Sequence, residues 1–387
     1  MKKSQPGIGG RRILLVGPQA PPYGGMALQA QKLERFLRLE GNSVDFFPSN
    51  LPFPNGLRFV DHLRGARPFV RSALIWLGLY GRIRRTDVVH VLAASWLYFF
   101  LVVAPAVILS RVHGKKVIIN YRSGEGEQFF RSYGWLAKPL FRLASAVTVP
   151  SDYLGAAIYR HFGVQASIIP NIVDFSSFPY RERAVFQPKI VVTRHLEKIY
   201  GIESVIRAFG KIQKLHPEAS LAIAGTGSQE DDLSSLVQRS QLKNVRFLGH
   251  VPHCDLAALY DRCDILLNGS QVDNFPGSLL EASASGLAVV STNAGGIPFI
   301  YETGVNAILV APDDWEGLAA GVERVLQDTR LGAEMTTAAL QLCQQCDWVN
   351  VRRLLYQSYG IAVPDAQTME LRDSSYSRSQ LGRSLKV

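Results

Sequence analysis

Residues 265–291 have the sequence ILLNGSQVDNFPGSLLEASASGLAVVS. The apolar run at 265–267 indicates a buried parallel strand, and residues 279–285 follow with helical spacing up to Gly286. A second apolar run at 288–291 indicates the next strand. Strand, helix and strand in this order form the unit from which open parallel sheets are built, so this stretch predicts an α/β fold.

The same alternation extends in both directions from this stretch. Upstream of residue 170 the predicted strands are 13–16, 44–47, 88–92, 117–120, 146–149 and 167–169. Downstream they are 190–192, 221–224, 245–248, 264–267, 288–291 and 307–310. The segment Asn171–Lys189 between the two series has little periodicity and contains Pro179 and Pro188. We therefore expect two Rossmann-like domains that face each other across a cleft, with ligands at the carboxyl ends of the strands.

Length and composition narrow the class of protein. The 387 residues suit two domains, and 47% hydrophobic with 19% charged residues is the balance of a globular protein. This excludes a mostly disordered, collagen-like or disulfide-stapled chain. Four cysteines suit a reducing compartment, and residues 1–10 lack the apolar core of a secretory signal, so we expect a cytoplasmic protein.

The charge is unevenly distributed along the chain. Residues 1–185 contain 24 basic and 10 acidic side chains, whereas residues 186–387 contain 18 and 22. A basic first half predicts an anionic partner: a membrane surface, a phosphorylated substrate or nucleic acid. Zinc-finger spacing and RNA-binding aromatic signatures do not accompany the charge, so no nucleic-acid partner is expected.

Two apolar stretches leave alternatives open. In the first, Arg58, Arg64, Arg67 and Arg71 precede residues 73–77, which contain Trp76, and three more arginines follow at 82–85. This pattern suits either a helix in a membrane interface or a core-facing helix with a solvated basic face. The second stretch, 88–109, is long enough to span a bilayer, but a buried strand followed by a helix from Trp96 to Arg111, with Pro105 inside it, is the favoured interpretation.

Residues 273–282 contain the most informative chemistry. Pro276, Gly277 and Ser278 suit the start of a helix, whose free N–H groups and positive dipole end would bind a diphosphate. Asp273 and Glu281 flank this point. Carboxylates beside an anion would repel it unless they bind hydroxyls, and the hydroxyls of a sugar and a ribose are the natural donors.

Several motifs, in order, give the chain a family resemblance. They are the carboxylates Asp273 and Glu281 eight residues apart, the helix and strand at 281–290, the loop 294–298, the segment 170–174 and Phe247-Leu248-Gly249. Over about residues 12–360 the chain resembles the retaining glycosyltransferases of family 4, which have the two-Rossmann GT-B architecture. The resemblance implies an N-terminal acceptor-binding domain (1–180), a C-terminal nucleotide-sugar-binding domain (181–345), a final helix returning to the first domain (346–363) and a polar tail (364–387).

The resemblance also implies roles for individual residues. Glu281 matches the carboxylate that binds the nucleotide ribose. Asp273 matches the carboxylate that contacts the donor sugar. Arg194 matches the arginine that neutralises the diphosphate. Asp replaces the usual Glu at position 273. The remaining donor-binding residues are expected to be Gly24, Gly25, Arg122, Gly225, Asn274, Phe275, Pro276, Gly277, Ser278 and Leu279.

Two positions depart from the family pattern. The family places a lysine just before a glycine here, but Tyr200 precedes Gly201 and Lys198 stands two residues earlier. Either Lys198 supplies the second cation from a shifted loop, or that cation is absent. Arg122 occupies the position where many members carry His-Gly, and it could bind sugar hydroxyls or phosphate.

The resemblance implies a hexosyltransferase that moves a sugar from a UDP- or GDP-sugar to a glycan or lipid-linked acceptor in cell-surface polysaccharide synthesis. No Asp-x-Asp motif is present, so no metal or other cofactor is expected. Peripheral contact with an anionic inner membrane surface is expected from the basic first half. The alternatives are a non-catalytic protein of the same fold, acting as one component of a complex, and a nucleotide-sugar epimerase or phosphorylase.

Overall fold

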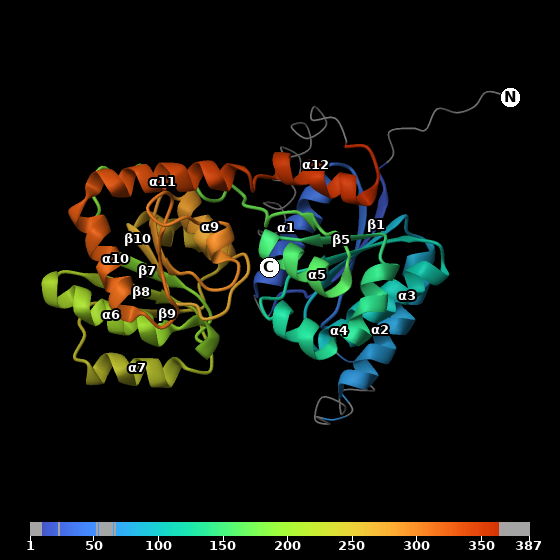
Figure 1. Cartoon of the computed structure of the whole chain (residues 1–387), viewed down its shortest axis with the longest axis horizontal. Coiled ribbons are helices and arrows are strands. Elements are labelled where there is room, and N and C mark those ends of the chain that lie inside the picture. The colour runs from blue at the N-terminus through green and yellow to red at the C-terminus, as the bar shows by residue number, and fades with distance from the viewer. Residues whose placement is uncertain (1–9, 22–23, 52, 54–64, 66, 364–387) are drawn as a thin grey trace, which may run out of the picture. The chain divides into compact units, whose positions relative to one another are not determined.

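The computed structural model describes residues 10–21, 24–51, 53, 65 and 67–363. The chain forms two compact units (Figure 1). Unit 1 comprises the described residues up to Pro150, Leu154–Ile172 and those from Val349 onward; unit 2 comprises Ser151–Tyr153 and Val173–Trp348. Each unit is built on one six-stranded parallel sheet, which confirms the predicted α/β class. The predicted tail 364–387 and the residues Arg58 and Arg64 lie outside the described part.

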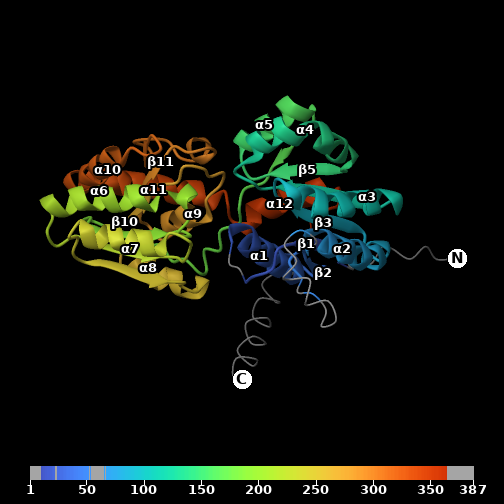
Figure 2. The same cartoon turned by 90° about the horizontal axis from the view of Figure 1, so that it is seen from below.

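Unit 1 has the strand order β2-β1-β3-β4-β5-β6. These strands are β1 Arg12–Gly17, β2 Ser43–Pro48, β3 Val88–Ala93, β4 Lys116–Tyr121, β5 Ala146–Val149 and β6 Ser167–Ile168. Its α-helices are α1 Gly25–Leu39, α2 Arg67–Arg84, α3 Ala104–Val112, α4 Gly126–Leu143, α5 Asp152–Phe162 and α12 Trp348–Tyr359. Helix α3 packs between α2 and α4, and right-handed crossovers put all three on one face of the sheet (Figure 2).

The helix predicted from Trp96 to Arg111 is irregular at its start. A π-helical turn, η2 Phe99–Val103, precedes α3, and Pro105 lies in the first turn of α3. Proline has no N–H for the carbonyl of Leu101, four residues earlier. The Ser72 hydroxyl of α2 donates to that carbonyl at 3.0 Å, so a neighbouring helix supplies the missing hydrogen bond.

The apolar stretch 88–109 is therefore the buried strand β3 followed by the η2–α3 helix, as favoured from the sequence. Within the described residues, no helix is both long and apolar enough to cross a membrane.

Unit 2 has the strand order β12-β11-β10-β7-β8-β9. These strands are β7 Lys189–Thr193, β8 Ser220–Ala224, β9 Val245–Gly249, β10 Ile265–Asn268, β11 Ala288–Thr292 and β12 Ile308–Val310. Its α-helices are α6 Ile202–Leu215, α7 Glu230–Arg239, α8 Leu256–Asp261, α9 Gly277–Ala284, α10 Trp315–Gln327 and α11 Thr329–Gln344. The direction in which strands are added reverses between β7 and β10, and such a switch point is where open α/β sheets bind ligands.

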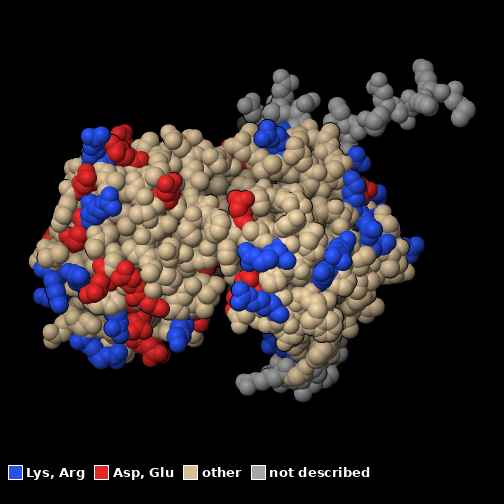
Figure 3. Space-filling model, viewed as in Figure 1, with Lys and Arg blue, Asp and Glu red and all other residues tan. Residues whose placement is uncertain are grey.

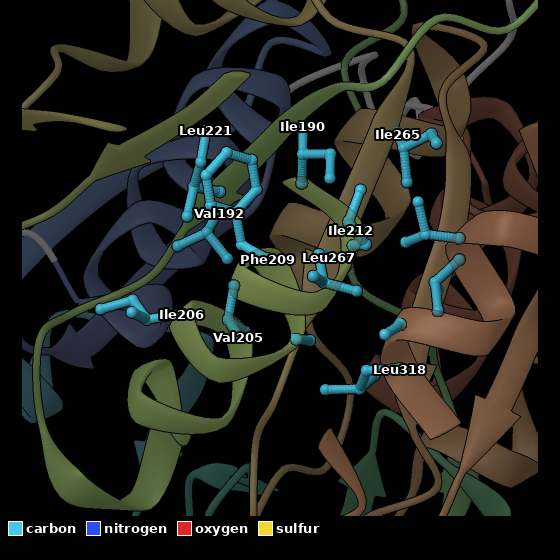
Figure 4. Close-up of a cluster of buried hydrophobic side chains, with 14 of the residues drawn as sticks. Ile190, Val192, Val205, Ile206, Phe209, Ile212, Leu221, Ile265, Leu267 and Leu318 are labelled. Atoms are coloured by element: carbon cyan, nitrogen blue, oxygen red, sulfur yellow. The ribbon is translucent and has the colours of Figure 1, made fainter. Parts of the chain in front are cut away.

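Alternate residues of the unit 2 strands fill two separate cores. Ile190 and Val192 of β7 pack with Phe209 of α6 and Leu318 of α10 on one face (Figure 4). Val191, between them, packs on the other face with residues of α9. Both faces of the strands are buried, which is why they are continuous apolar runs in the sequence. Cys343 and Cys346 lie in the second core, where burial raises the pKa of both thiols and that of Cys346 to about 12.

Helix α12 is part of unit 1 although it ends the described chain. Its Arg352 pairs with Glu40 at 3.2 Å, and Asn42 donates to the Tyr356 hydroxyl at 2.5 Å. The Tyr359 hydroxyl lies 2.9 Å from His90 Nδ1 in the middle of β3. Buried polar contacts, in addition to packing, therefore hold the helix against β3 and against residues 40–42, which precede β2.

Candidate active site

The switch point of unit 2 brings two of the predicted residues together. Arg194 directly follows β7, and Asp273 lies in the loop after β10. Arg194 donates from Nη2 to Asp273 Oδ2 at 2.6 Å, and its Nε donates to Asn268 Oδ1 at 3.1 Å. Both side chains of the ion pair are 12% exposed. The guanidinium is therefore held in a fixed orientation and is largely buried.

Asp273 uses both carboxylate oxygens within the protein. Oδ2 accepts from Arg194, and Oδ1 accepts from the backbone N–H of Asn274 at 2.8 Å. In this structure the residue acts first as an anchor for Arg194. Its predicted contact with the donor sugar stays a prediction.

The N-terminus of α9 carries buried polar atoms for which the described residues offer no partner. Asn274 Nδ2 and Ser278 Oγ are both fully enclosed and make no hydrogen bond within the described part of the chain. The Asn274 amide is fixed from its other end, because Ser151 donates to Oδ1 at 2.5 Å. Unsatisfied buried groups are rare in folded proteins and are explained where a ligand completes them. Beside the free N–H groups of a helix start, these two atoms fit an anionic or hydroxyl-rich ligand.

Phe275 and Pro276 complete the loop that leads into this helix. Pro276 is the N-terminal capping residue, and α9 begins at Gly277, close to the start predicted from the sequence. Leu279 is buried in the core of unit 2 and contributes backbone rather than side chain to the loop end.

Glu281 lies one turn inside α9 and is 6% exposed. Its Oε1 is 2.9 Å from Nε2 of His253, a residue of the short helix η4 His253–Asp255 that follows β9. The imidazole also meets the Phe178 ring edge to face at 5.2 Å. Sequence analysis missed His253, which is 28 residues from Glu281. The one available signal was its place just after a predicted strand, at the edge of the sheet where the loops converge.

Two glycines set the spacing of the loops around Arg194 and Asp273. A Cβ on Gly225, whose φ is +153°, would lie 1.8 Å from the carbonyl oxygen of Arg194. A Cβ on Gly295, with φ +55°, would lie 2.0 Å from the carbonyl oxygen of Asp273. Only glycine permits such backbone contact. Gly225 therefore shapes the loop that carries Arg194.

Lys198 and Tyr200 lie in the short helix η3 Lys198–Tyr200. Tyr200 is part-buried, and the Arg194 guanidinium lies 5.4 Å from the centre of its ring. Lys198 is exposed, and its side chain makes no hydrogen bond or ion pair with another described residue. The aromatic ring, rather than the lysine, is the neighbour of Arg194 in this structure.

Gly24 and Gly25 belong to unit 1, where they begin α1. A Cβ on either residue would meet nothing within 4 Å. The φ of Gly24 is −90°, which any residue can adopt. The fold itself does not require glycine here, which is consistent with a backbone left bare for a ligand.

Arg122 follows β4 in unit 1. Its guanidinium donates to the amide oxygens of Asn120, at 3.1 Å, and of Asn171. Burial lowers the pKa of the guanidinium to about 10. Asn120 in turn donates to His90 Nε2 at 3.0 Å, so Arg122 is joined to α12 through His90 and Tyr359.

The structure thus assembles Arg194, Asp273 and the α9 N-terminus at one switch point, with Glu281 further along α9. Gly24, Gly25 and Arg122 belong to unit 1. Within the described part of the chain, no group of three or more His, Cys, Asp or Glu side chains could hold a metal ion.

Comparisons with known proteins agree with this arrangement. The model for Glycosyltransferase Family 4 matches residues 23–177, and the model for Glycosyl transferases group 1 matches residues 181–341. The chain is 27% identical to the glycogen synthase of Mycobacterium tuberculosis, over 90% of this chain and 94% of that one. It is 31% identical to one polypeptide of human phosphatidylinositol N-acetylglucosaminyltransferase, over 43% of this chain and 34% of that one.

Among solved structures, Anabaena HepE in complex with UDP-glucose has a TM-score of 0.71 at 19% identity, covering 90% of this chain and 99% of that one. The fold and the matched regions define the protein as a glycosyltransferase of the two-domain GT-B type. It belongs to the family 4-like glycosyltransferases, with a family 4 N-terminal region and a group 1 C-terminal region.

Proposed function

We propose that this enzyme is a retaining glycosyltransferase that moves a hexose-type sugar from a UDP- or GDP-sugar to a glycan or lipid-linked acceptor in cell-surface polysaccharide synthesis. The observation that carries the proposal is the start of α9, where the buried Asn274 Nδ2 and Ser278 Oγ lack partners among the described residues, next in sequence to Asp273, the partner of Arg194. A nucleoside diphosphate supplies oxygen acceptors for these two groups and a charge that suits Arg194.

The chemistry follows from the charges that develop when the bond between sugar and diphosphate breaks. Negative charge grows on the leaving phosphate, where Arg194 and the N–H groups of α9 stabilise it. Glu281 accepts hydrogen bonds from the ribose hydroxyls, and Asp273 keeps Arg194 aimed at the diphosphate. In the proposed retaining reaction, the acceptor attacks from the face that the leaving group vacates, and the leaving phosphate takes the acceptor's proton.

A lipid-linked acceptor is supported by charge and by one relative. The first half of the chain is strongly basic, and the human relative is named for transfer to phosphatidylinositol. Arg122, bonded to amide oxygens rather than to a carboxylate, suits a phosphate or sugar hydroxyl of a substrate. We propose that the enzyme works at an anionic membrane surface, where such an acceptor resides.

The donor site is tested by calorimetric titration with UDP, GDP and ADP, with and without Mg²⁺, on the wild type and on Glu281→Gln. One nucleotide is expected to bind tightly without Mg²⁺. Glu281→Gln is expected to lower the affinity for that nucleotide about tenfold or more, because hydrogen bonds to a carboxylate are lost. Glu302→Gln, at an exposed glutamate of unit 2, is the matched control and should bind as the wild type does.

Absence of nucleotide binding by the folded protein would contradict the proposal and favour a non-catalytic role in a complex. Conversion of the sugar nucleotide to an epimer without any acceptor would favour an epimerase. Proton NMR of the product's anomeric signal separates retention from inversion.

A further inference from the structure

Helix α2 is apolar on two adjoining faces. Its inner face contributes Ile75, Leu79 and Ile83 to the core of unit 1. Its outward side chains follow one another at helical spacing and are also apolar: Phe69, Ala73, Trp76, Leu77 and Tyr80. Leu77 is 75% exposed and Phe69 is 65% exposed. The sequence left open a membrane-interface helix or a core-facing helix with a solvated basic face. The helix does face the core, and its exposed residues include this apolar stripe as well as Arg67, Arg82 and Arg84.

The two neighbouring helices repeat this arrangement. The η2–α3 segment turns outward the apolar residues Leu97, Leu101, Ala104, Ile108 and Val112, spaced three or four apart. Helix α4 turns outward Tyr133, Trp135, Leu136, Pro139 and Leu143, and Trp135 is 77% exposed. Helix α3 contacts both α2 and α4. Ring contacts also join these segments: Tyr133 meets Trp96 and Phe100, and Tyr80 meets His113. We call the three stripes together the α2–α4 face.

Basic residues accompany this face. Residues 65–145 contain 12 Lys or Arg and 3 Asp or Glu. The three acidic side chains already have partners within unit 1: Asp87 with Arg12, Glu125 with Trp96, and Glu127 with Arg131 and His161. Where Figure 1 places α2, α3 and α4, Figure 3 shows a broad uncharged surface with Lys and Arg at its margin.

Basic residues gather where the three helices end. Arg82 and Arg84 lie in the last turn of α2, Arg111 in that of α3 and Arg142 in that of α4. A helix C-terminus favours cations, which accounts for part of this charge. It does not account for the apolar stripes between these positions, because a helix surface that faces water is ordinarily polar.

Unit 2 gives the internal contrast. Its exposed large apolar residues come from separate loops, helices and a strand: Tyr180, Val185, Ile199, Leu215, Leu248, Phe299 and Val305. Scattered apolar residues of this kind are normal on a protein surface, whereas a contiguous exposed patch marks an interaction site.

We propose that the α2–α4 face docks on an anionic lipid bilayer. Trp, Tyr and Leu side chains enter the interface between headgroups and acyl chains. The arginines at the helix ends bind lipid phosphates, apart from Arg82, which pairs with Asp45. The three acidic residues of this region already have partners within unit 1, so little unpaired negative charge is present to repel an anionic surface. This inference extends the membrane contact included in the proposed function and gives it a location.

Cosedimentation with lipid vesicles tests this docking. The full chain is mixed with vesicles of phosphatidylglycerol and phosphatidylcholine, or of phosphatidylcholine alone, at low and at high salt. The protein is expected to bind the anionic vesicles and to bind the neutral ones more weakly. The affinity of the double variant L77S/W135S for anionic vesicles is expected to fall about tenfold or more, because two exposed apolar side chains no longer enter the interface.

The matched control is V185S/L215S, which removes two comparably exposed apolar residues of unit 2. It should bind vesicles as the wild type does. Thermal unfolding and nucleotide titration of both double variants show that the fold and the donor site are intact.

Three results would overturn the inference. They are absence of binding to anionic vesicles at low salt, equal loss in both double variants, and wild-type self-association that L77S/W135S abolishes while vesicle binding is unchanged. The last would make the face an interface between copies of this chain. Vesicle binding and nucleotide binding are measured separately. A protein that does not bind vesicles would contradict the membrane docking but not the proposed donor site. A protein that does not bind nucleotides would contradict the donor site but not the docking.

Discussion

Units 1 and 2 share a six-stranded parallel sheet, and in both of them side chains hold an arginine guanidinium at its carboxyl edge. Unit 2 adds close backbone packing, because the loops that carry Arg194 and Asp273 lie against Gly225 and Gly295. In unit 1 the guanidinium of Arg122 is instead joined through the Asn120 side chain to the buried His90. Backbone contacts give one fixed geometry, which suits a ligand part common to many substrates, such as a diphosphate. Side-chain contacts can change with single substitutions, which suits a part that differs between enzymes.

The largest expected effect comes from Gly225→Ala. The new methyl group would overlap the Arg194 carbonyl, and alanine strongly disfavours a φ of +153°, so the loops must separate. We expect a loss of about 2 kcal/mol or more in the free energy of unfolding, together with loss of nucleotide binding. Urea unfolding and calorimetric titration measure the two effects.

Gly24→Ala is the matched substitution in unit 1. Nothing lies within 4 Å of the added Cβ, so the free energy of unfolding should change by less than about 0.5 kcal/mol. If a ligand approaches this backbone, the transfer rate falls although stability does not. Equal destabilisation by both alanines would refute the contrast between the units.

A smaller effect is expected from pH and should be confined to unit 1. Burial, aided by the charge of Arg122, lowers the pKa of His90 to about 3, so the folded protein holds this imidazole neutral. The unfolded chain takes up a proton below a pH of about 6.5, and unfolding therefore becomes easier as the pH falls from there toward 3. Between pH 7.5 and 5.0 the free energy of unfolding should drop by about 2 kcal/mol on account of His90.

Urea unfolding at the two pH values measures this drop. His90→Gln should flatten the pH dependence, whatever it does to absolute stability, because the titrating group is gone. An unchanged slope in His90→Gln would show that His90 is not the coupled group.

The sequence predicted the strands well because most of them are buried on both faces. The run at 190–192, for example, is the centre of β7, and the helix expected after Pro276 is α9. These features depend on local composition and on spacing within one segment. The sequence did not predict features that depend on a partner distant in sequence. One is the π-helical turn η2, which accompanies the hydrogen bond from Ser72 to the carbonyl of Leu101. Another is the contact of His253 with Glu281, which comes from a different loop.

The apolar face of α2 shows a different limit. Periodicity detects a helix with one apolar face, but a helix that is apolar on two faces gives a weak pattern and suggests complete burial. Only the packing of Ile75 and Leu79 shows which face is inside. The remaining stripe then requires an explanation of its own.

The smallest expected effect concerns Tyr200, where the family has lysine. Its ring lies beside the Arg194 guanidinium, and such contacts contribute about 0.5–2 kcal/mol. Tyr200→Ala should therefore weaken nucleotide binding by about fivefold, because Arg194 loses one of the groups that orient it. Tyr200→Phe keeps the ring and should bind nearly as the wild type does, which calorimetric titration can resolve. Equal weakening in both variants would assign the effect to the hydroxyl group, and no effect in either would leave Asp273 and Asn268 as the groups that hold Arg194 in place.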